Sequence, residues 1–179
     1  MNIFFLDWNP RQAAEWHCDK HVVKMILETA QMLYAAHWIL NPANVPDSAY
    51  KLAHKNHPCT IWVRKSLANY LWLASLGWWL CKEYQYRYGE HKVHKTEKHI
   101  IWLLHNPPVG IPYSGITEPA QAMPQTFKQS NPIDAYHTFY RESKLNQRGI
   151  VAYTKREWPS FLRMNTPVPV SQLNHTLQT

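Results

Sequence analysis

The stretch that decides the fold runs from residue 10 to residue 40 and reads PRQAAEWHCDKHVVKMILETAQMLYAAHWIL. Asn9 is a favourable N-cap residue, and Pro10 suits the first position of a helix. Asn41-Pro42 ends the segment. Most of its positions are apolar or small, which is typical of a helix that is buried on most sides. The sequence therefore predicts one long, largely buried helix over residues 10–40.

A line of polar side chains interrupts this apolar helix. At about 100° per residue, steps of four, three, four and three residues keep five side chains on one narrow stripe. Lys20 lies at its edge, and the stripe itself consists of His17, His21, Lys24, Glu28 and Gln31. Burial of such groups costs several kcal/mol unless they pair with one another or with a ligand. We therefore expect the stripe to face an internal cleft and to hold the functional site.

The rest of the chain predicts further helices around one long loop. Asn56-His57-Pro58 and Asn131-Pro132 are helix-start signals, and residues 106–130 are proline-rich and typical of a lid or binding loop. The expected elements are a short strand or extended arm at 2–6 and helices at about 59–88, 96–105 and 131–145, followed by a weaker segment at 148–163 and a frayed end from about 165. The sequence thus predicts a mainly α, compact single-domain helical bundle spanning residues 1–179.

Composition narrows the range of functions. The 179 residues carry a net charge of +7, with eleven His, nine Trp and ten Tyr. A basic surface with many aromatic rings favours a nucleic-acid or nucleotide partner, because phosphates pair with cations and bases stack on rings. Three cysteines without a CxxC pair favour a reducing cytoplasm, and no apolar run is long enough to cross a membrane. The sequence lacks glycine-rich phosphate loops and serine-hydrolase motifs.

The polar stripe permits three interpretations. In the first, Glu28 is a catalytic acid/base or electrostatic group, with His21 and Lys24 as its catalytic neighbours. In the second, His17 and His21 bind a metal together with Glu28, although a lone HxxxH is a weak metal signal. In the third, the groups form a structural network between helices. We favour the first interpretation and expect no metal and no cofactor.

A second set of candidate residues follows the loop before residue 59. Asn56, His57 and Arg64 lie at a helix start, where free backbone N–H groups favour an anion, and Asn69 interrupts an apolar run. We expect these four residues to bind substrate, while His57 alternatively serves only as a helix cap. A basic run formed by Arg87, His91, Lys92, His94, Lys95 and Lys98 is either a solvated face or a contact for phosphates.

The stripe and the segment before it resemble the pyrimidine-dimer DNA glycosylases of the endonuclease V type. In that family a short N-terminal arm leads into a helix with a D-x-H unit, a catalytic Glu seven residues after the His and an Arg ten after it. This chain has Asp19-Lys20-His21, Glu28 and Gln31 at those positions, and Ile3-Phe4-Phe5-Leu6-Asp7-Trp8-Asn9-Pro10 resembles the arm. Arg156-Glu157-Trp158-Pro159-Ser160-Phe161 is faintly similar to the family's C-terminal tail. The chain otherwise resembles proteins of tailed phages.

The resemblance implies an all-α fold and the removal of a damaged or modified base, followed by strand cleavage through a Schiff base on the N-terminal amine. It makes Glu28 the catalytic carboxylate and His21 a residue of the substrate site. Asp19, Lys20 and Gln31 would contact substrate, with Gln31 standing where the family has Arg. Because Asn2 disfavours removal of Met1, the amine would be that of Met1, Lys20 or Lys24, or the lyase step would be absent.

These observations favour a cytoplasmic enzyme that acts on a nucleic-acid base or nucleotide, most of all a DNA glycosylase with DNA as its partner. Two alternatives stay open at this point. One is a metal-dependent phosphoesterase acting on nucleotides. The other is a non-enzymatic phage factor that binds a nucleotide or a protein. No membrane partner is expected, and the sequence leaves the oligomeric state undetermined.

Overall fold

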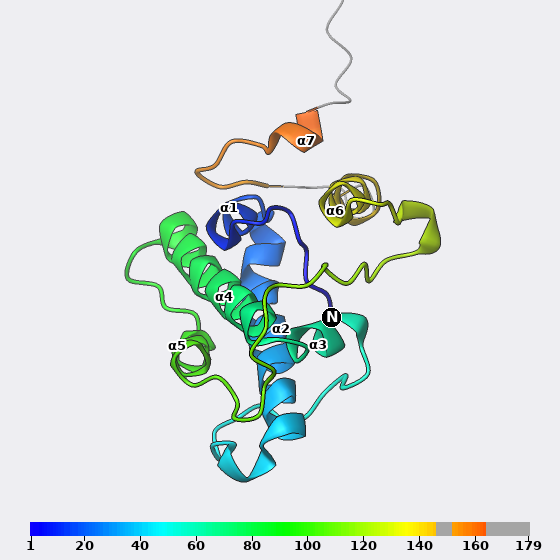
Figure 1. Cartoon of the computed structure of the whole chain (residues 1–179). Coiled ribbons are helices and arrows are strands. Elements are labelled where there is room, and N and C mark those ends of the chain that lie inside the picture. Colours follow the sequence, from blue (N-terminus) through cyan, green and yellow to red (C-terminus); the bar gives the residue numbers. More distant parts are fainter. Residues whose placement is uncertain (146–151, 164–179) are drawn as a thin grey trace, which may run out of the picture.

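The computed structural model describes residues 1–145 and 152–163 of the chain (Figure 1). It is mainly α, as predicted, and the described residues contain no strand. The helices are α1 (Pro10–Glu15), α2 (Asp19–Leu40), α3 (Pro58–Val63), α4 (Leu67–Tyr88), α5 (Glu97–His105), α6 (Pro132–Phe139) and α7 (Ser160–Arg163), with 3-10 turns η1 (Pro42–Asn44) and η2 (Gln125–Phe127) and a π-helical turn η3 (Tyr140–Leu145). The frayed end predicted from about residue 165 lies outside the described residues.

The prediction of one helix over 10–40 is wrong at residues 16–18. Helix α1 ends at Glu15, Cys18 is extended with φ −67° and ψ 160°, and α2 begins at Asp19. The buried Arg87 side chain from α4 donates to the carbonyl oxygens of Glu15 and His17 at 2.9 and 2.8 Å. These bonds satisfy carbonyls that the helix break leaves without partners. The break therefore depends on a residue about 70 positions away in sequence.

The predicted helix over about 59–88 is also two helices. His57 caps α3, because its ring nitrogen accepts the Cys59 N–H at 3.2 Å. A turn follows at residues 64–66, and the Ser66 hydroxyl then caps α4 by accepting the Asn69 N–H at 3.1 Å. A Ser at the N-cap is a common local signal. The turn separates short α3 from α4, which packs along α2.

Helices α2 and α4 form the centre of the molecule, and α5 packs against both of them (Figure 1). Their close approach needs Gly77 of α4. A Cβ atom built there would lie 2.8 Å from a methyl carbon of Thr29 in α2 and 2.8 Å from one of Ile100 in α5. A side chain at this position would push three helices apart, so Gly77 sets their spacing.

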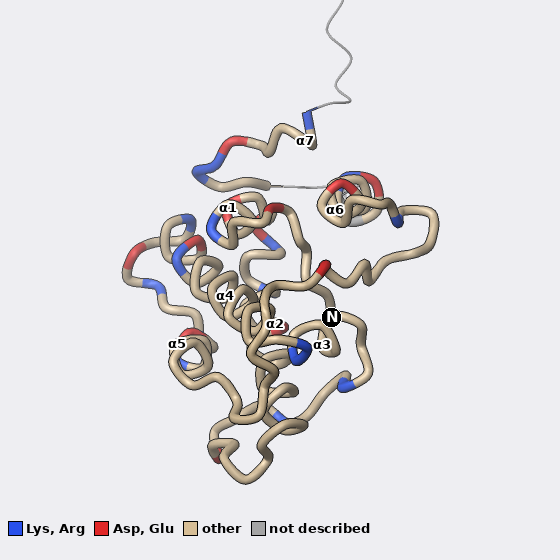
Figure 2. Tube along the Cα trace, viewed as in Figure 1, with Lys and Arg blue, Asp and Glu red and all other residues tan. Residues whose placement is uncertain are grey.

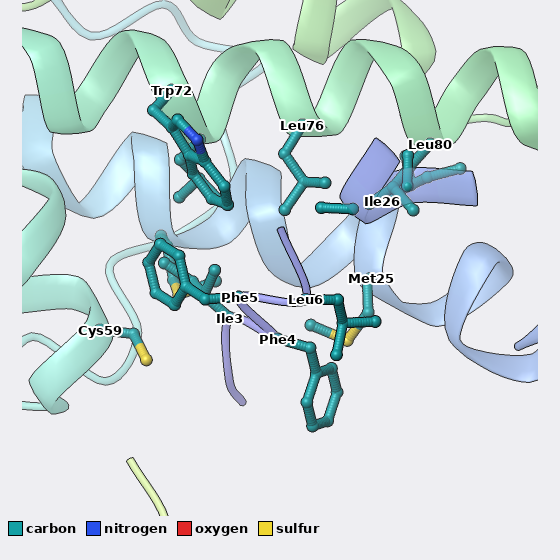
Figure 3. Close-up of a cluster of buried hydrophobic side chains, with 14 of the residues drawn as sticks. Ile3, Phe4, Phe5, Leu6, Met25, Ile26, Cys59, Trp72, Leu76 and Leu80 are labelled. Atoms are coloured by element: carbon teal, nitrogen blue, oxygen red, sulfur yellow. The ribbon is translucent and has the colours of Figure 1, made fainter. Parts of the chain in front are cut away.

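The N-terminal segment is an extended arm inside the core and not a strand. Figure 3 shows Ile3, Phe4, Phe5 and Leu6 packed among side chains of α2 and α4. Ile3, Phe5 and Leu6 have no exposed surface. The Phe5 ring stacks on Trp72 of α4 with ring centroids 4.6 Å apart. The arm is thus fixed by apolar packing, and its first residues are held against α2.

Residues 106–131 form the predicted long loop, interrupted only by η2. The loop crosses the molecule from the end of α5 to the start of α6 (Figure 1). It is fixed to α4 by Asn69, whose carboxamide bonds to both the N–H and the hydroxyl of Thr117 at 2.9 and 2.8 Å. None of the described helices combines the length and apolar character needed to cross a membrane.

Candidate functional site

Glu28 lies where the N-terminal arm meets α2. Its carboxylate is mostly buried and takes three contacts, one of them the backbone N–H of Asn2, which donates to Oε2 at 3.0 Å. The α-amine of Met1 lies 3.7 Å from the same oxygen, and Lys24 Nζ lies 3.2 Å from Oε1. Two amines of different type therefore flank one carboxylate, and we call these three groups the Glu28 centre. Such a group can accept or hold a proton next to a nucleophile.

The Asn2 side chain fixes the start of the arm. Its Nδ2 donates to the carbonyl oxygen of Ala122 at 3.1 Å. Its Oδ1 accepts from the Ile3 N–H at 2.8 Å, from Tyr136 Oη at 3.2 Å and from Cys59 Sγ at 3.4 Å. Asn2 as a whole residue is only 8 % exposed, so these bonds are shielded from water. Asn2 thus ties the arm to α3, α6 and the long loop at once.

Met1 is packed and not free in solvent. Its side chain is 3 % exposed, and the Thr60 hydroxyl of α3 lies 3.8 Å from its sulfur. Burial lowers the pKa of His57, the α3 cap, and the positive Met1 amine lowers it further, while Glu28 opposes these effects. The pKa of His57 therefore depends on the charges of Met1 and Glu28, as expected for a residue that lies near both. Its role as a helix cap is confirmed, and its role in substrate binding stays a prediction.

His21 lies beside this centre, in contact with aromatic side chains. Its ring stacks on Phe4 of the arm with centroids 4.7 Å apart, and its Nδ1 lies 2.8 Å from the Tyr140 hydroxyl. That hydroxyl also accepts the Cys18 N–H at 2.8 Å. The side chain is therefore oriented from two sides. Its predicted catalytic role stays a prediction.

The polar stripe does not line an open internal cleft, and this part of the prediction is wrong. His17 lies in the turn before α2, fully buried, and its Nδ1 donates to the Ala13 carbonyl oxygen at 2.6 Å. Burial lowers its pKa to about 4. The arm covers the stripe at Glu28, whereas the Lys24 side chain is 66 % exposed and His21 and Gln31 are half-buried. The arm supplies the partners that we expected from a ligand.

Asp19 and Arg87 form a buried ion pair. The guanidinium is fully buried and lies 2.9 Å from Asp19 Oδ1, while Thr154 donates to Asp19 from the C-terminal segment. Burial alone would raise the pKa of Asp19, but the hydrogen bonds from Thr154 and Arg87 lower it. The interpretation of Arg87 as a phosphate contact is therefore wrong. Asp19 holds the C-terminal segment, and substrate contact by Asp19 stays a prediction.

The remaining candidates differ in their access to solvent. Lys20 and Asn56 are exposed, and Gln31 and Arg64 are half-buried. Arg64 Nη1 donates to the Lys55 carbonyl oxygen at 2.7 Å, which brings the turn after α3 next to the loop before it. Asn69 has no exposed surface, and its amide bonds to Trp62 and Thr117 within the protein. The structure thus gives Asn69 a structural role, and its predicted contact with substrate stays a prediction.

The second interpretation of the stripe required convergent metal ligands. Among residues 1–145 and 152–163, no three His, Cys, Asp or Glu side chains come together in a group that could hold a metal ion. His17 lies within the helix break at residues 16–18 and His21 lies in α2, so they do not form the helical i, i+4 pair that a chelating motif needs. The donor set of the described residues does not favour the metal interpretation.

Sequence reasoning missed several residues of this centre. Asn2 and Phe4 were assigned only to the arm, Cys59 to a helix start, and Tyr140 to a helix. The Cys59 thiol is buried beside Asn2, and burial raises its pKa to about 11. The only signal for Asn2 was the resemblance of the arm to a known family. The others touch the centre through contacts that a single sequence does not display.

Cations lie around this centre as well as on more distant parts of the surface. Figure 2 shows Lys and Arg positions at the turn after α3 and in the preceding loop, on the side where the chain begins in this view. Lys55, Arg64 and Lys65 belong to this group, and Lys20 and Lys24 lie on α2. Cationic side chains on a protein surface attract anions.

Comparison with protein families gives a match to this chain. A family model described as pyrimidine dimer DNA glycosylase matches residues 1–96. These residues include the arm and helices α1 to α4, and thus Met1, Lys24 and Glu28. Tyr136, Tyr140 and the loop residues that contact the arm lie outside the match. Searches of curated proteins and of solved structures found no match to the chain. The match covers more than half of the chain. The chain belongs to the pyrimidine dimer DNA glycosylase family.

Proposed function

We propose that this protein is a DNA glycosylase that cleaves the N-glycosidic bond of a damaged or modified base, with Glu28 as the catalytic carboxylate. The observation that carries the proposal is the Glu28 carboxylate between two amines, 3.7 Å from Met1 N and 3.2 Å from Lys24 Nζ. Family membership supports DNA as the substrate class. The cations on the same side of the molecule support binding of its phosphates.

Two groups are candidates for the nucleophile in a step that joins enzyme and DNA. As a class, α-amines are weaker bases than lysine side chains, so near neutral pH a larger fraction of them is unprotonated and nucleophilic. We therefore favour the Met1 amine over Lys24. The amine nitrogen attacks C1′ with its lone pair, and the N-glycosidic bond breaks with its electron pair leaving on the base. Loss of a proton from nitrogen and opening of the sugar ring, with O4′ taking a proton, then give the Schiff base.

Glu28 would serve this sequence in two ways. Its negative charge stabilises the positive charge that develops on the sugar when the base departs. It also lies close enough to the amine to accept the proton that nitrogen loses. The Asn2 N–H, at 3.0 Å, orients the carboxylate for both roles.

The test uses duplex DNA that carries a single pyrimidine dimer. Wild-type protein should cleave the N-glycosidic bond of the damaged base, and borohydride should trap a covalent adduct between protein and DNA. Glu28→Gln should lower the single-turnover rate by about 100-fold or more while duplex binding persists. Lys24→Gln is the matched control and should still form the adduct, whereas acetylation of the Met1 amine should abolish it.

Failure to cleave any glycosidic bond in dimer-containing or base-modified duplex would refute the proposal. An adduct that forms with the acetylated amine but not with Lys24→Gln would transfer the nucleophilic role to the lysine. Full activity of Glu28→Gln would remove the carboxylate from the mechanism.

A further inference from the structure

The long loop carries an apolar tip that has no place in the core. Tyr113 is 93 % exposed, and Ile116 is 45 % exposed. A Cβ atom built on Gly115, between them, would have no neighbour within 4 Å. The tip at residues 113–116 therefore stands clear of the body of the protein. An exposed aromatic side chain flanked by another apolar one is typical of a binding surface.

This tip is held at both ends. The Pro112 carbonyl oxygen accepts the Leu67 N–H of α4 at 2.8 Å and the Ser114 N–H at 3.0 Å. On the other side, Thr117 bonds through its N–H and hydroxyl to the buried carboxamide of Asn69. The Trp62 indole also donates to the Thr117 carbonyl oxygen at 3.3 Å. Tyr113 is therefore presented on a fixed support, which lowers the entropy lost when it binds.

Cations lie at the base of the tip. The bond between Pro112 and Leu67 brings the tip to the turn after α3, which contains Arg64 and Lys65. Lys65 is exposed, and Arg64 is half-buried. Within residues 106–123 the only carboxylate is Glu118. An aromatic ring beside cations matches the stacked bases and phosphates of nucleic acid.

A chain of contacts links the tip to the Glu28 centre. Thr117 bonds to Trp62 at one end of α3, and Cys59 at the other end bonds to Asn2, which bonds to Glu28. Tyr113 is four residues from Thr117, a span of at most about 14 Å even in a fully extended chain. A duplex bound at Glu28 extends about 3.4 Å per base pair along its axis. The tip and the centre therefore lie at the two ends of one chain of contacts through α3.

We infer that Tyr113 stacks on a base of the duplex DNA that is bound at Glu28, while Lys65 and Arg64 contact the neighbouring phosphates. This inference rests on the proposed function, because it takes DNA as the molecule bound at Glu28. Enzymes that act on a base must open the stack around it, and an aromatic side chain compensates a base that loses its neighbour. The tip lies outside the residues that the family model matches.

The test measures binding of a fluorescein-labelled duplex that carries one dimer and, next to it, the fluorescent base 2-aminopurine. Glu28→Gln protein serves as the background, so that turnover is slow compared with the binding measurement. Adding Tyr113→Ala should weaken binding by about 5- to 150-fold and lower the change in 2-aminopurine fluorescence. Tyr113→Phe should restore both, because a phenyl ring stacks without the hydroxyl.

Salt dependence separates stacking from phosphate contact. Tyr113→Ala should leave the slope of log K against log salt unchanged, whereas Lys65→Gln should reduce its magnitude by about 0.9. Val93→Ala, an exposed apolar side chain between α4 and α5, is the matched control and should change neither quantity.

Equal duplex affinity and equal 2-aminopurine signals for Tyr113→Ala and the background protein would overturn the inference, and the tip would then be left for a protein partner. The 93 % exposure of Tyr113 means that the substitution leaves the fold intact, which circular dichroism checks. The proposed function is judged separately by cleavage of the glycosidic bond in protein with Glu28 intact. Cleavage without stacking, and stacking without cleavage, are therefore distinguishable results.

Discussion

Replacement of Arg87 by Met should destabilise the protein severely. The guanidinium has no exposed side-chain surface and makes four hydrogen bonds of 2.8–2.9 Å. Two go to the carbonyl oxygens of Glu15 and His17 at the helix break, and two to the carboxylates of Asp19 and Glu83. Methionine keeps much of the apolar stem but supplies none of the four donors.

The size of the loss follows from what the substitution leaves behind. Two buried carbonyls lose a partner, and two shielded carboxylates lose their central cation, although Thr154 still bonds to Asp19 and Arg156 to Glu83. Breaking a buried ion pair by removing one member costs about 3–5 kcal/mol. A domain of this size has a total stability of about 5–15 kcal/mol. Arg87→Met should therefore remove roughly a fifth or more of the free energy of unfolding.

Urea titration followed by circular dichroism and tryptophan fluorescence measures this loss. Arg11→Met is the matched control, because the Arg11 side chain is 61 % exposed and its pair with Glu15 is on the surface. An exposed pair contributes about 0–1 kcal/mol, so the control should stay close to wild type. A loss below about 1 kcal/mol for Arg87→Met, or an equal loss for both variants, would refute the reasoning.

Three further results are expected. Burial lowers the pKa of His17 and of His37 to about 4, so between pH 6.5 and 4 the unfolded chain binds protons that the folded protein does not. The free energy of unfolding should therefore fall as pH falls through that window, by about 3 kcal/mol per histidine. In urea titrations, His17→Gln should remove about half of the pH dependence that these two histidines cause. Asn69→Ala removes one of the two bonds to the Trp62 carbonyl oxygen and the bonds to the N–H and hydroxyl of Thr117, so thermal unfolding should report a loss of about 1–3 kcal/mol, which Asn69→Asp would not rescue. Incubation with a chelator should leave glycosidic-bond cleavage unchanged, and loss of activity that added divalent metal restores would support the phosphoesterase alternative instead.

Helix starts were predictable because their signals are local. Asn9, His57 and Asn131 each precede a proline, and each side chain accepts a backbone N–H two residues ahead. Such a bond is complete within three residues of sequence. The break at 64–66 also carries a local signal, the N-cap Ser66, which the prediction did not use, whereas the break at 16–18 has no such signal. The break at 16–18 needs Arg87, whose side chain looked like part of a surface basic run until its burial was known.

The same distinction between local signals and contacts of distant residues applies to the candidate site. Glu28 was identified from its place on an apolar helix and from its spacing to His21. Asn2 and Tyr140 were not, because they lie 26 residues from Glu28 and 119 from His21, respectively, and reach them only in the folded chain. The burial of Glu28 was correctly predicted. The source of its partners was not, since the arm supplies what we expected from a cleft or ligand.

An extended arm can satisfy Glu28 in a way that another helix could not. Within a helix, backbone N–H groups beyond the first turn already bond to carbonyls, so they cannot also bind a carboxylate. In the arm, the Asn2 N–H is available and donates to Glu28 at 3.0 Å, with the Met1 amine beside it. The arm keeps this position because Phe5 stacks on Trp72 in the core. The chemistry of the centre therefore depends on apolar packing several residues away, and a cavity beneath the arm would displace the amine from the carboxylate before it unfolded the helices.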